Sequence, residues 1–419
     1  LYVNKMLLQV EKKKNALRFI LDISKPYLNI PEARFAIAHA AFSAGNKKMA
    51  LEELDKIESI NPKWETAVLF RGYIIGKEWP EKAFAFYQDF LRKNPKSNEV
   101  RLEYAKVLTN LKKYDEAKKQ FLKLVNSSLA SSEISLTVAL LAIELGDNIL
   151  AEKYFIQSLK RGYSKPAQIH IYLAGIYDDR GDFEEALTWL KKITSVNNEY
   201  FIDSRILMAE YIAKYDSVDS AIEMLNRLKK KRLSSNEKLI ILRNKASLLL
   251  TENRNQDAYD LMKLDEEEFR DSPEFKFDYA ILSEKMGNTL LMEQLLLEAI
   301  KLKPDYATAY NALGYSYADR NIKLQKAKQY IEVALSYEPN NHYILDSMGW
   351  VHFKLGNLEI ALQFIKKAYA IIKDPEIAAH LGEILWIQGK KEEAKEVWNN
   401  SLNRYPSNTV LRETTNRFR

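Results

Sequence analysis

Residues 174–186 read AGIYDDRGDFEEA, and this short stretch contains the pattern that decides the fold. A small residue, Ala174, lies seven positions before Gly181 and twelve positions before a second small residue, Ala186. The second small position recurs at intervals of 33 to 37 residues, at Ala50, Ala83, Ala117, Ala151, Ala186, Ala221, Ala258, Met292, Ala327, Ala361 and Ala394. A period of this length predicts a chain built from one repeated supersecondary unit.

Three further series of residues keep the same period. Small residues precede the first series by about twelve positions, with Arg71 as the exception, at Ala38, Ala105, Ala139, Ala174, Ala209, Ala246, Ala280, Gly314, Gly349 and Gly382. Glycine lies between the two series at Gly45, Gly146, Gly181, Gly287, Gly356 and Gly389, and proline closes repeats at Pro62, Pro95, Pro304, Pro339 and Pro406. Small residues let two helices cross closely, glycine ends the first helix, and proline starts the next one. The sequence therefore predicts helix–turn–helix repeats.

This pattern resembles the tetratricopeptide repeat (TPR), a helix–turn–helix unit of about 34 residues. The resemblance covers residues 31–406, as eleven repeats that begin near 31, 64, 98, 132, 167, 202, 239, 273, 307, 342 and 375. It implies an all-α fold, a right-handed α-solenoid of eleven or twelve stacked repeats with a concave inner face. We expect a degenerate repeat or cap at 1–30, repeats 1–5 at 31–201, irregular repeats 6–7 at 202–272, repeats 8–11 at 273–406 and a short polar tail at 407–419.

One interval departs from the regular period. It runs from Ala221 to Ala258, spans 37 residues and contains the basic segment 227–232, which reads RLKKKR. One interpretation is an extended second helix followed by a solvated loop, and the alternative is a basic docking patch or a hinge. Because residues 202–270 also match the repeat pattern least well, we expect a pliable centre between two regular arms.

The composition excludes several kinds of chemistry. The 419 residues include no cysteine, which excludes a thiol nucleophile, disulfides, cysteine-ligated zinc and iron–sulfur clusters. The chain has 63 Lys and Arg and 57 Asp and Glu, and the net charge of +6 is a weak signal for nucleic acid or membrane partners. No apolar run is long enough to span a membrane. The chain begins at Leu1 rather than Met, so we expect its natural N-terminus to lie upstream.

Enzyme motifs are missing from the sequence. It has no phosphate-binding glycine loop, dinucleotide fingerprint or nucleophile elbow, and no two of its five histidines have a metal-binding spacing. We interpret the histidines as packing residues of the repeats, and the alternative is a histidine–carboxylate site of His352, His380 and Glu383. Basic residues are dispersed, without a stacking-aromatic motif, which argues against nucleic acid binding. We therefore expect a protein that is not an enzyme and has no cofactor, metal or nucleic acid partner.

In TPR proteins, residues of the first helix line the inner face, and the resemblance assigns nine positions here to protein binding. They are Asn311, Tyr315 and Asp319 in repeat 9, Tyr343, Asp346, Trp350 and Phe353 in repeat 10, and Glu383 and Trp386 in repeat 11. Aromatic side chains with acidic neighbours suit protein recognition, because they offer a large contact area at a small entropic cost. The alternative is that some of these aromatics pack against the next first helix, and both interpretations stay open.

The C-terminal quarter has a narrower resemblance. Residues 311–320 (NALGYSYADR), 345–350 (LDSMGW) and 374–386 (DPEIAAHLGEILW) look like TPR outer-membrane lipoproteins of Gram-negative bacteria. Members of that family are adaptors that deliver cell-wall hydrolases to periplasmic carboxyl-terminal processing proteases. The resemblance implies a periplasmic scaffold that binds this protease and its substrates, and that is held at the outer membrane by a lipid anchor. This sequence lacks the cysteine that would carry the lipid. The alternative is a scaffold for secretion, polysaccharide export or pilus assembly.

Overall fold

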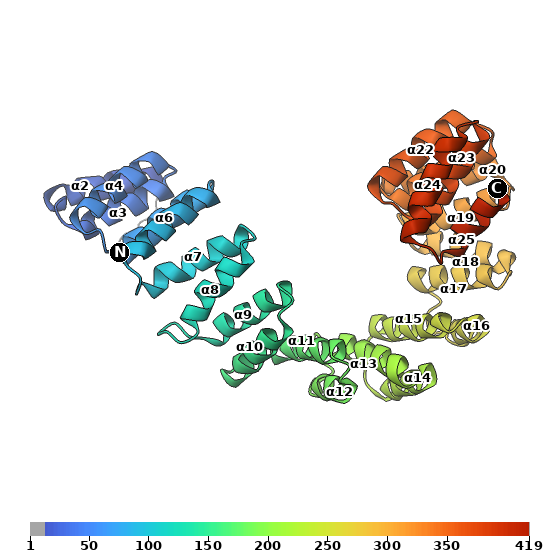
Figure 1. The fold of residues 1–419 in the computed structure, drawn as a ribbon, viewed down its shortest axis with the longest axis horizontal. Helices are drawn as coiled ribbons and strands as arrows, with labels where there is room; N and C mark the ends of the chain where they lie inside the picture. Colours follow the sequence, from blue (N-terminus) through green and yellow to red (C-terminus); the bar gives the residue numbers. More distant parts are fainter. Residues whose placement is uncertain (1–12, 419) are drawn as a thin grey trace. The chain divides into compact units, whose positions relative to one another are not determined.

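The computed structural model describes residues 13–418, and every regular element in that range is a helix (Figure 1). The helices alternate between the two positions of the predicted repeat, which confirms the all-α solenoid fold. The first helices are α3 (Pro31–Ser43), α5 (Glu65–Gly76), α7 (Asn98–Asn110), α9 (Ser132–Glu144), α11 (Pro166–Asp179), α13 (Phe201–Tyr215), α15 (Ser235–Thr251), α17 (Pro273–Lys285), α19 (Ala307–Asp319), α21 (His342–Lys354) and α23 (Pro375–Ile387). The second helices are α4 (Lys47–Ile60), α6 (Pro80–Lys93), α8 (Tyr114–Leu124), α10 (Asn148–Lys160), α12 (Phe183–Lys191), α14 (Val218–Asn226), α16 (Asn255–Leu264), α18 (Thr289–Leu302), α20 (Leu324–Tyr337), α22 (Leu358–Ile371) and α24 (Lys391–Arg404).

Among residues 13–418, four more helices lie outside this alternation or interrupt it. They are α2 (Lys13–Ser24) before the first full repeat, α25 (Thr409–Arg417) after the last one, and the 3₁₀ helices η1 (Lys25–Tyr27) and η2 (Arg227–Lys230). Ala16 and Ile20 of α2 are buried, and Ile20 packs with Ile37 and Ala40 of α3. The described part of the predicted cap at 1–30 is therefore a second-position helix, while residues 1–12 lie outside the described residues.

The chain divides into two compact bodies, Leu1–Ser204 and Arg205–Arg419. In the N-terminal body, one apolar core continues from Val68 of α5 to Ile176 of α11. In the C-terminal body, a second core continues from Leu345 of α21 to Leu411 of α25. Each core is shared by successive repeats, as expected where a single helix pair cannot bury its apolar faces alone.

The small residues of the first helices lie where the two helices of a repeat cross. A Cβ atom added to Gly382 would lie 2.1 Å from Nε1 of Trp398, and one added to Gly349 would lie 2.2 Å from Cγ1 of Ile365. In repeat 2, where the sequence series has Arg71, the crossing is made by the next residue. A Cβ on Gly72 would lie 2.1 Å from the ring of Tyr87. The apparent exception is therefore a shift by one position, and the close crossing is kept.

The turn between the two helices uses a left-handed residue in most of the repeats. The glycine at this turn in repeat 5, Gly181, has a φ of 76°, and the other five of the predicted series lie between 72° and 83°. Lys112, Asn253 and Asn321 adopt φ values of 57°, 58° and 55° in the corresponding turns of repeats 3, 7 and 9, which lack this glycine. The left-handed turn is thus kept in these three repeats without glycine, at the steric cost of a side chain in this region.

The irregular segment corrects one expectation. The second helix of repeat 6 is not extended, because α14 ends at Asn226 and η2 follows it directly. The next first helix, α15, is 17 residues long and begins with a capping box. In that box, Glu237 N donates to the Ser234 side chain, and Ser234 N donates to the Glu237 carboxylate at 2.7 Å. The extra length of this interval therefore lies in the link 231–234 and in α15.

The C-terminal residues correct another expectation, because 407–419 do not form a simple polar tail. Residues Thr409–Arg417 form α25, whose N-cap Asn408 accepts a hydrogen bond from Leu411 N at 2.9 Å. Leu411 is completely buried, and the Phe418 ring lies 5.6 Å from that of Trp398. This helix occupies the first-helix position of a twelfth, incomplete repeat and covers the apolar side of repeat 11. Within residues 13–418, none of the helices combines the length and the apolar character that a transmembrane helix needs.

Candidate functional site

The first helices of repeats 9–11 bring residues from three repeats to one surface. Asn311, Tyr315 and Asp319 are spaced four apart on α19, so they share one side of that helix. On α21, Asp346, Trp350 and Phe353 share a side in the same way. We call the surface made by these residues, together with Tyr343, Glu376 and His380, the first-helix face.

The centre of the first-helix face is a buried ion pair between neighbouring repeats. His380 Nδ1 lies 2.9 Å from Asp346 Oδ2 and 3.1 Å from Oδ1. The Trp350 ring stacks on the imidazole, with the ring centroids 4.1 Å apart and the planes inclined by 21°. His380 is 6% exposed and Trp350 is 5% exposed, so solvent hardly reaches this stack.

A tyrosine extends the cluster to a third repeat. The hydroxyl of Tyr315 donates to Glu376 Oε1 at 3.0 Å, and its ring centroid lies 6.3 Å from that of His380. This hydrogen bond joins residues 61 positions apart in the sequence. Residues of α19, α21 and α23 therefore meet at one place, and the cluster ties three successive repeats together.

The environment of the cluster shifts two pKa values. Burial alone would lower the pKa of His380, but the charge of Asp346 and its hydrogen bond outweigh burial, so the pKa of His380 is raised. Glu376 and Glu383 act in the same direction. Burial, and then the negative charges of Glu376, Asp319 and Asp346, raise the pKa of the Tyr315 hydroxyl. The raised pKa values thus favour the protonated imidazole of His380 and the neutral phenol of Tyr315.

The nine predicted residues do not all face solvent. Trp350, Asp346 and Glu383 are buried, whereas Asn311, Tyr315, Phe353 and Trp386 are half-buried. Only Asp319 and Tyr343 are exposed, and Tyr343 is 55% exposed. For Trp350, therefore, packing between repeats describes its place better than an open binding surface does. A partner can reach Asp319, Tyr343 and the accessible edges of Asn311, Tyr315 and Phe353.

In repeat 11, helix α25 covers the predicted residues. Glu383 Oε2 forms an ion pair with Arg417 Nη2 at 3.1 Å. The Trp386 ring lies 5.8 Å from that of Phe418 and 5.9 Å from that of Trp398. Glu383 and Trp386 thus hold α25 in place, and in this structure they do not offer a free surface to a partner.

The alternative histidine–carboxylate site is not formed as predicted. His352 Nδ1 lies 3.3 Å from Asn357 Nδ2, and its ring stacks on Phe364, so its contacts are with α22 and the turn before it. His380 pairs with Asp346 rather than with Glu383. Among the described residues, no group of three or more His, Asp or Glu side chains is arranged to hold a metal ion.

Sequence reasoning missed His380 and Glu376 as members of the face. Their signal was present, because Asp346 and His380 are separated by 34 residues, about one repeat, and so occupy adjacent places in the stack. A carboxylate and a histidine one repeat apart on first helices are candidates for an ion pair between repeats. Glu376, in the first turn of α23, holds in repeat 11 the inner-face position that Tyr343 holds in repeat 10, but it was not among the nine predicted residues.

Comparison with known proteins identifies the repeat. A sequence model described as tetratricopeptide repeat matches residues 136–197. The TPR repeat-containing protein PA4667 of Pseudomonas aeruginosa is 27% identical over 214 residues, which is 51% of this chain and 36% of PA4667. The TPR repeat-containing protein MJ1428 of Methanocaldococcus jannaschii is 36% identical over 72 residues, 17% of this chain and 13% of that protein. The chain thus spans about a third or less of the length of the curated relatives it matches.

Solved structures give weaker likenesses. A chain in the structure of Naa15/Naa10 bound to HypK-THB aligns with 94% of this chain and 67% of its own length, at 15% identity and a TM-score of 0.47. A tetratricopeptide repeat protein from Parabacteroides merdae aligns with 59% of this chain and 96% of its own length, at 16% identity and a TM-score of 0.46. At these TM-scores neither likeness bears on function. The helix alternation and the close crossings show an α-solenoid of helix–turn–helix repeats, and residues 136–197 of this solenoid match the tetratricopeptide repeat.

Proposed function

We propose that this chain is an adaptor without enzymatic activity, which binds a periplasmic carboxyl-terminal processing protease and presents cell-wall hydrolases to it. TPR solenoids serve as scaffolds for protein–protein interaction, and this chain has that fold. An adaptor acts by holding protease and substrate together, which raises their effective concentration without any chemistry of its own. We further propose that it works in the periplasm, held at the outer membrane by a lipid anchor that lies outside this sequence.

The observation that carries the proposal is the construction of the first-helix face. Tyr315, Asp346, Trp350 and His380 hold one another through the contacts described above, so their side chains are fixed before a partner arrives. A preorganised surface loses little conformational entropy on binding. Beside this fixed centre lie the exposed Asp319 and Tyr343, a charge and an aromatic ring of the kinds that contribute strongly to protein interfaces.

The sequence of the same region supports the choice of partner. The stretches 311–320, 345–350 and 374–386, which resemble the adaptor lipoproteins, are the stretches that contain Asn311, Tyr315, Asp319, Asp346, Trp350, Glu376, His380, Glu383 and Trp386. The resemblance to a protease adaptor therefore falls on the residues that build the face, rather than on distant parts of the chain.

The test is co-purification from the native cell. We would immobilise the 419-residue chain, incubate it with detergent-solubilised cell envelope and identify the retained proteins by mass spectrometry. The proposal expects recovery of a carboxyl-terminal processing protease together with at least one cell-wall hydrolase. The double variant Asp319→Lys/Tyr343→Ala changes only exposed groups of the face. It should reduce this recovery about tenfold, which corresponds to 1.4 kcal/mol of binding free energy.

The matched control is Tyr337→Ala, because Tyr337 is 49% exposed on the second helix α20 of repeat 9. This variant should retain the partners as the unmodified chain does. Recovery of neither protease nor hydrolase would refute the adaptor function. Recovery that is unchanged by the double variant would refute the assignment of the face. Retention of secretion, polysaccharide export or pilus proteins instead would establish the alternative scaffold.

A further inference from the structure

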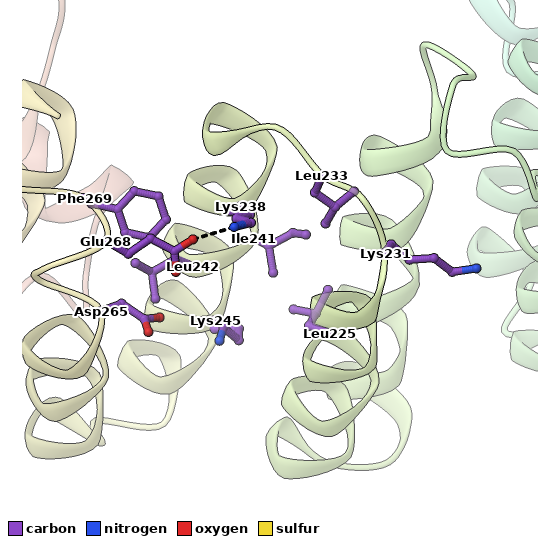
Figure 2. A pocket seen from close by; sticks show the side chains of 10 residues that line it. All are labelled: Leu225, Lys231, Leu233, Lys238, Ile241, Leu242, Lys245, Asp265, Glu268 and Phe269. Atoms are coloured by element: carbon purple, nitrogen blue, oxygen red, sulfur yellow. Dashed lines mark hydrogen bonds and ion pairs between the residues drawn. The ribbon is translucent and has the colours of Figure 1, made fainter. Parts of the chain in front are cut away.

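A cavity of about 210 Å³ lies in the C-terminal body, beside the irregular segment (Figure 2). Its apolar lining comes from three places: Leu225 at the end of α14, Leu233 in the link before α15, and Ile241 and Leu242 on α15. Phe269, in the segment that follows α16, closes another side. Leu225, Ile241, Leu242 and Phe269 are all buried, so this is a packed apolar lining rather than a surface dimple.

The cavity lies where repeat 6 departs from the period. Helix α14 has nine residues, as α12 has, whereas the second helices α18, α20, α22 and α24 have 14 each. After Asn226 the chain continues through η2 and the link 231–234 to α15. Lys245 of α15, only 2% exposed, donates to Asn226 Oδ1 at 3.1 Å and so holds the end of α14 at one edge of the opening.

The charged residues that line the cavity are Lys231, Lys238 and Lys245 on one side of the balance, and Asp265 and Glu268 on the other. Lys238 forms an ion pair with Glu268 at 2.6 Å, which Figure 2 shows between α15 and the segment after α16. In contrast, Lys231 and Arg232 are exposed and form no ion pair with any described residue. Figure 2 shows the Lys231 side chain extending away from the apolar side chains, which places its ammonium group outside the cavity. The rim on the side of the link therefore carries uncompensated positive charge.

We propose that this cavity is a binding site for an acidic peptide segment of a partner protein, which inserts one large apolar side chain between α14 and α15. Its carboxylates pair with Lys231 and Arg232 at the rim. The site lies outside the first-helix face, and the inference does not depend on the partner proposed for that face. It gives Lys231 and Arg232, at the end of the basic segment 227–232, a role in docking, which was one of the two interpretations drawn from the sequence.

The size and the polarity of the site favour this occupant. A cavity of about 150 Å³ lined by Leu, Ile and Phe accepts a benzene molecule, so 210 Å³ holds a phenyl ring or a leucine side chain. Apolar anchors in desolvated pockets provide much of the affinity of protein interfaces, while charges at the rim increase the association rate and the specificity. A buried apolar pocket next to free cations fits a peptide that has both kinds of group.

The direct test is fluorescence anisotropy with the 419-residue chain and labelled peptides of about 12 residues. The probes are acidic peptides of Glu, Asp and Ser with a single central Phe, Trp or Leu. Each has one counterpart with Ala at the centre and one in which Gln and Asn replace the acids. We expect the best acidic probe to bind at least tenfold more tightly than either of its counterparts. Its affinity should fall as the salt concentration rises, because the rim pairs are exposed to solvent.

Variants of the protein locate the binding. Lys231→Glu/Arg232→Glu reverses the rim charge at exposed positions and should weaken binding at least tenfold. Leu233→Trp places a larger side chain at the half-buried edge of the cavity and should do the same. The matched controls are Ile240→Trp, at an exposed position of α15 that does not line the cavity, and Lys263→Glu, on the exposed side of α16. Both controls should bind the probe as the unmodified chain does.

Three results would overturn the inference. The first is that no acidic probe binds more tightly than its Ala counterpart. The second is equal loss of binding in Lys263→Glu and in the rim variant, which would indicate nonspecific charge attraction. The third is that dodecanoate, a small anionic amphiphile, occupies the cavity while no peptide does, with binding lost in Leu233→Trp. If Leu233→Trp fails to fold by circular dichroism, the rim variant and the peptide pairs still decide between these outcomes.

Discussion

The carboxylate of Asp346 and the imidazole of His380 lie 2.9 Å apart, and each side chain is 8% exposed. The two residues belong to neighbouring repeats, so the pair fixes the stacking of α23 on α21. Trp350 covers the pair, and Tyr315 extends the contact to α19 through Glu376. The accessible part of the first-helix face is therefore supported by the buried side chains of Asp346, Trp350 and His380.

Removing one member of this pair should destabilise the C-terminal body strongly. We predict that Asp346→Ala lowers the free energy of unfolding by about 3–5 kcal/mol, because it leaves a buried imidazole without its carboxylate. Urea unfolding of this chain, monitored by tryptophan fluorescence, measures this loss. The control Asp319→Ala removes an exposed carboxylate of α19 and should stay within about 0.5 kcal/mol. Equal effects of the two variants would contradict the structural role of the pair.

The same pair should make stability depend on pH. The pKa of His380 is raised in the folded chain, so its contribution is fully present below the unfolded pKa of about 6.5. That contribution is lost as the pH rises through the folded pKa, which lies above 6.5. Burial lowers the pKa values of His39, His170 and His352. The contribution of these three residues to stability therefore has the opposite pH dependence and grows as the pH rises.

The difference between the unmodified chain and His380→Gln isolates the contribution of His380. We predict that the stability advantage of the unmodified chain shrinks as the pH is raised from 6 to 9. Thermal unfolding at a series of pH values gives this difference. A constant or growing difference over that range would show that His380 is not held protonated by Asp346.

Replacing two glycines of first helices with alanine should change the stability in opposite directions, and this difference tests the close crossings. We predict that Gly382→Ala destabilises the chain by about 1–3 kcal/mol, since the new Cβ would lie 2.1 Å from Nε1 of Trp398. Gly175→Ala on α11 meets no atom within 4 Å and should stabilise the chain by about 0.5–1 kcal/mol through helix propensity. Thermal unfolding of both variants checks this. Destabilisation by both, or by neither, would contradict the packing described here.

The sequence predicted the repeat because its determinants are local. The small residue at a crossing and the left-handed residue at a turn both act within one helix pair. The regular recurrence of these residue types along the sequence therefore reveals the repeat. Shifts of one position, such as Gly72 for Arg71, break the period without breaking the packing. The polar composition of 407–419 hid α25, because only Leu411, Thr414 and Thr415 of that helix are buried.

The site was less predictable for a related reason. First-helix positions that face a partner in one repeat face the next first helix in another, and the choice depends on how neighbouring repeats stack. Trp350 is buried because His380 and Phe353 stack on it, and Trp386 is half-buried because Phe418 reaches it. The contacts of Trp350 with His380 and of Trp386 with Phe418 both join residues of different repeats. Tyr343 and Asp319, which have no such neighbour covering them, stay exposed.

Helix α25 should stabilise the last full repeat. We predict that Leu411→Ala lowers the free energy of unfolding by about 2–5 kcal/mol, because Leu411 is fully buried in the core of repeat 11. The exposed neighbour Arg412→Ala should have little effect. Hydrogen–deuterium exchange of α23 and α24 measures the change locally. Unchanged protection of both helices in Leu411→Ala would show that α25 does not support the repeat.

Site-specific photo-crosslinking shows whether partners bind the first-helix face of repeats 9–11. A photoreactive p-benzoylphenylalanine is placed singly at positions 319 and 343 on the face, and at positions 337 and 405 on exposed sites elsewhere in the same repeats. The chain is then irradiated in solubilised envelope of the native cell. We predict that positions 319 and 343 cross-link to the protease or to a cell-wall hydrolase, and that positions 337 and 405 do not. Cross-links to these partners from 337 or 405, with none from 319 or 343, would contradict it.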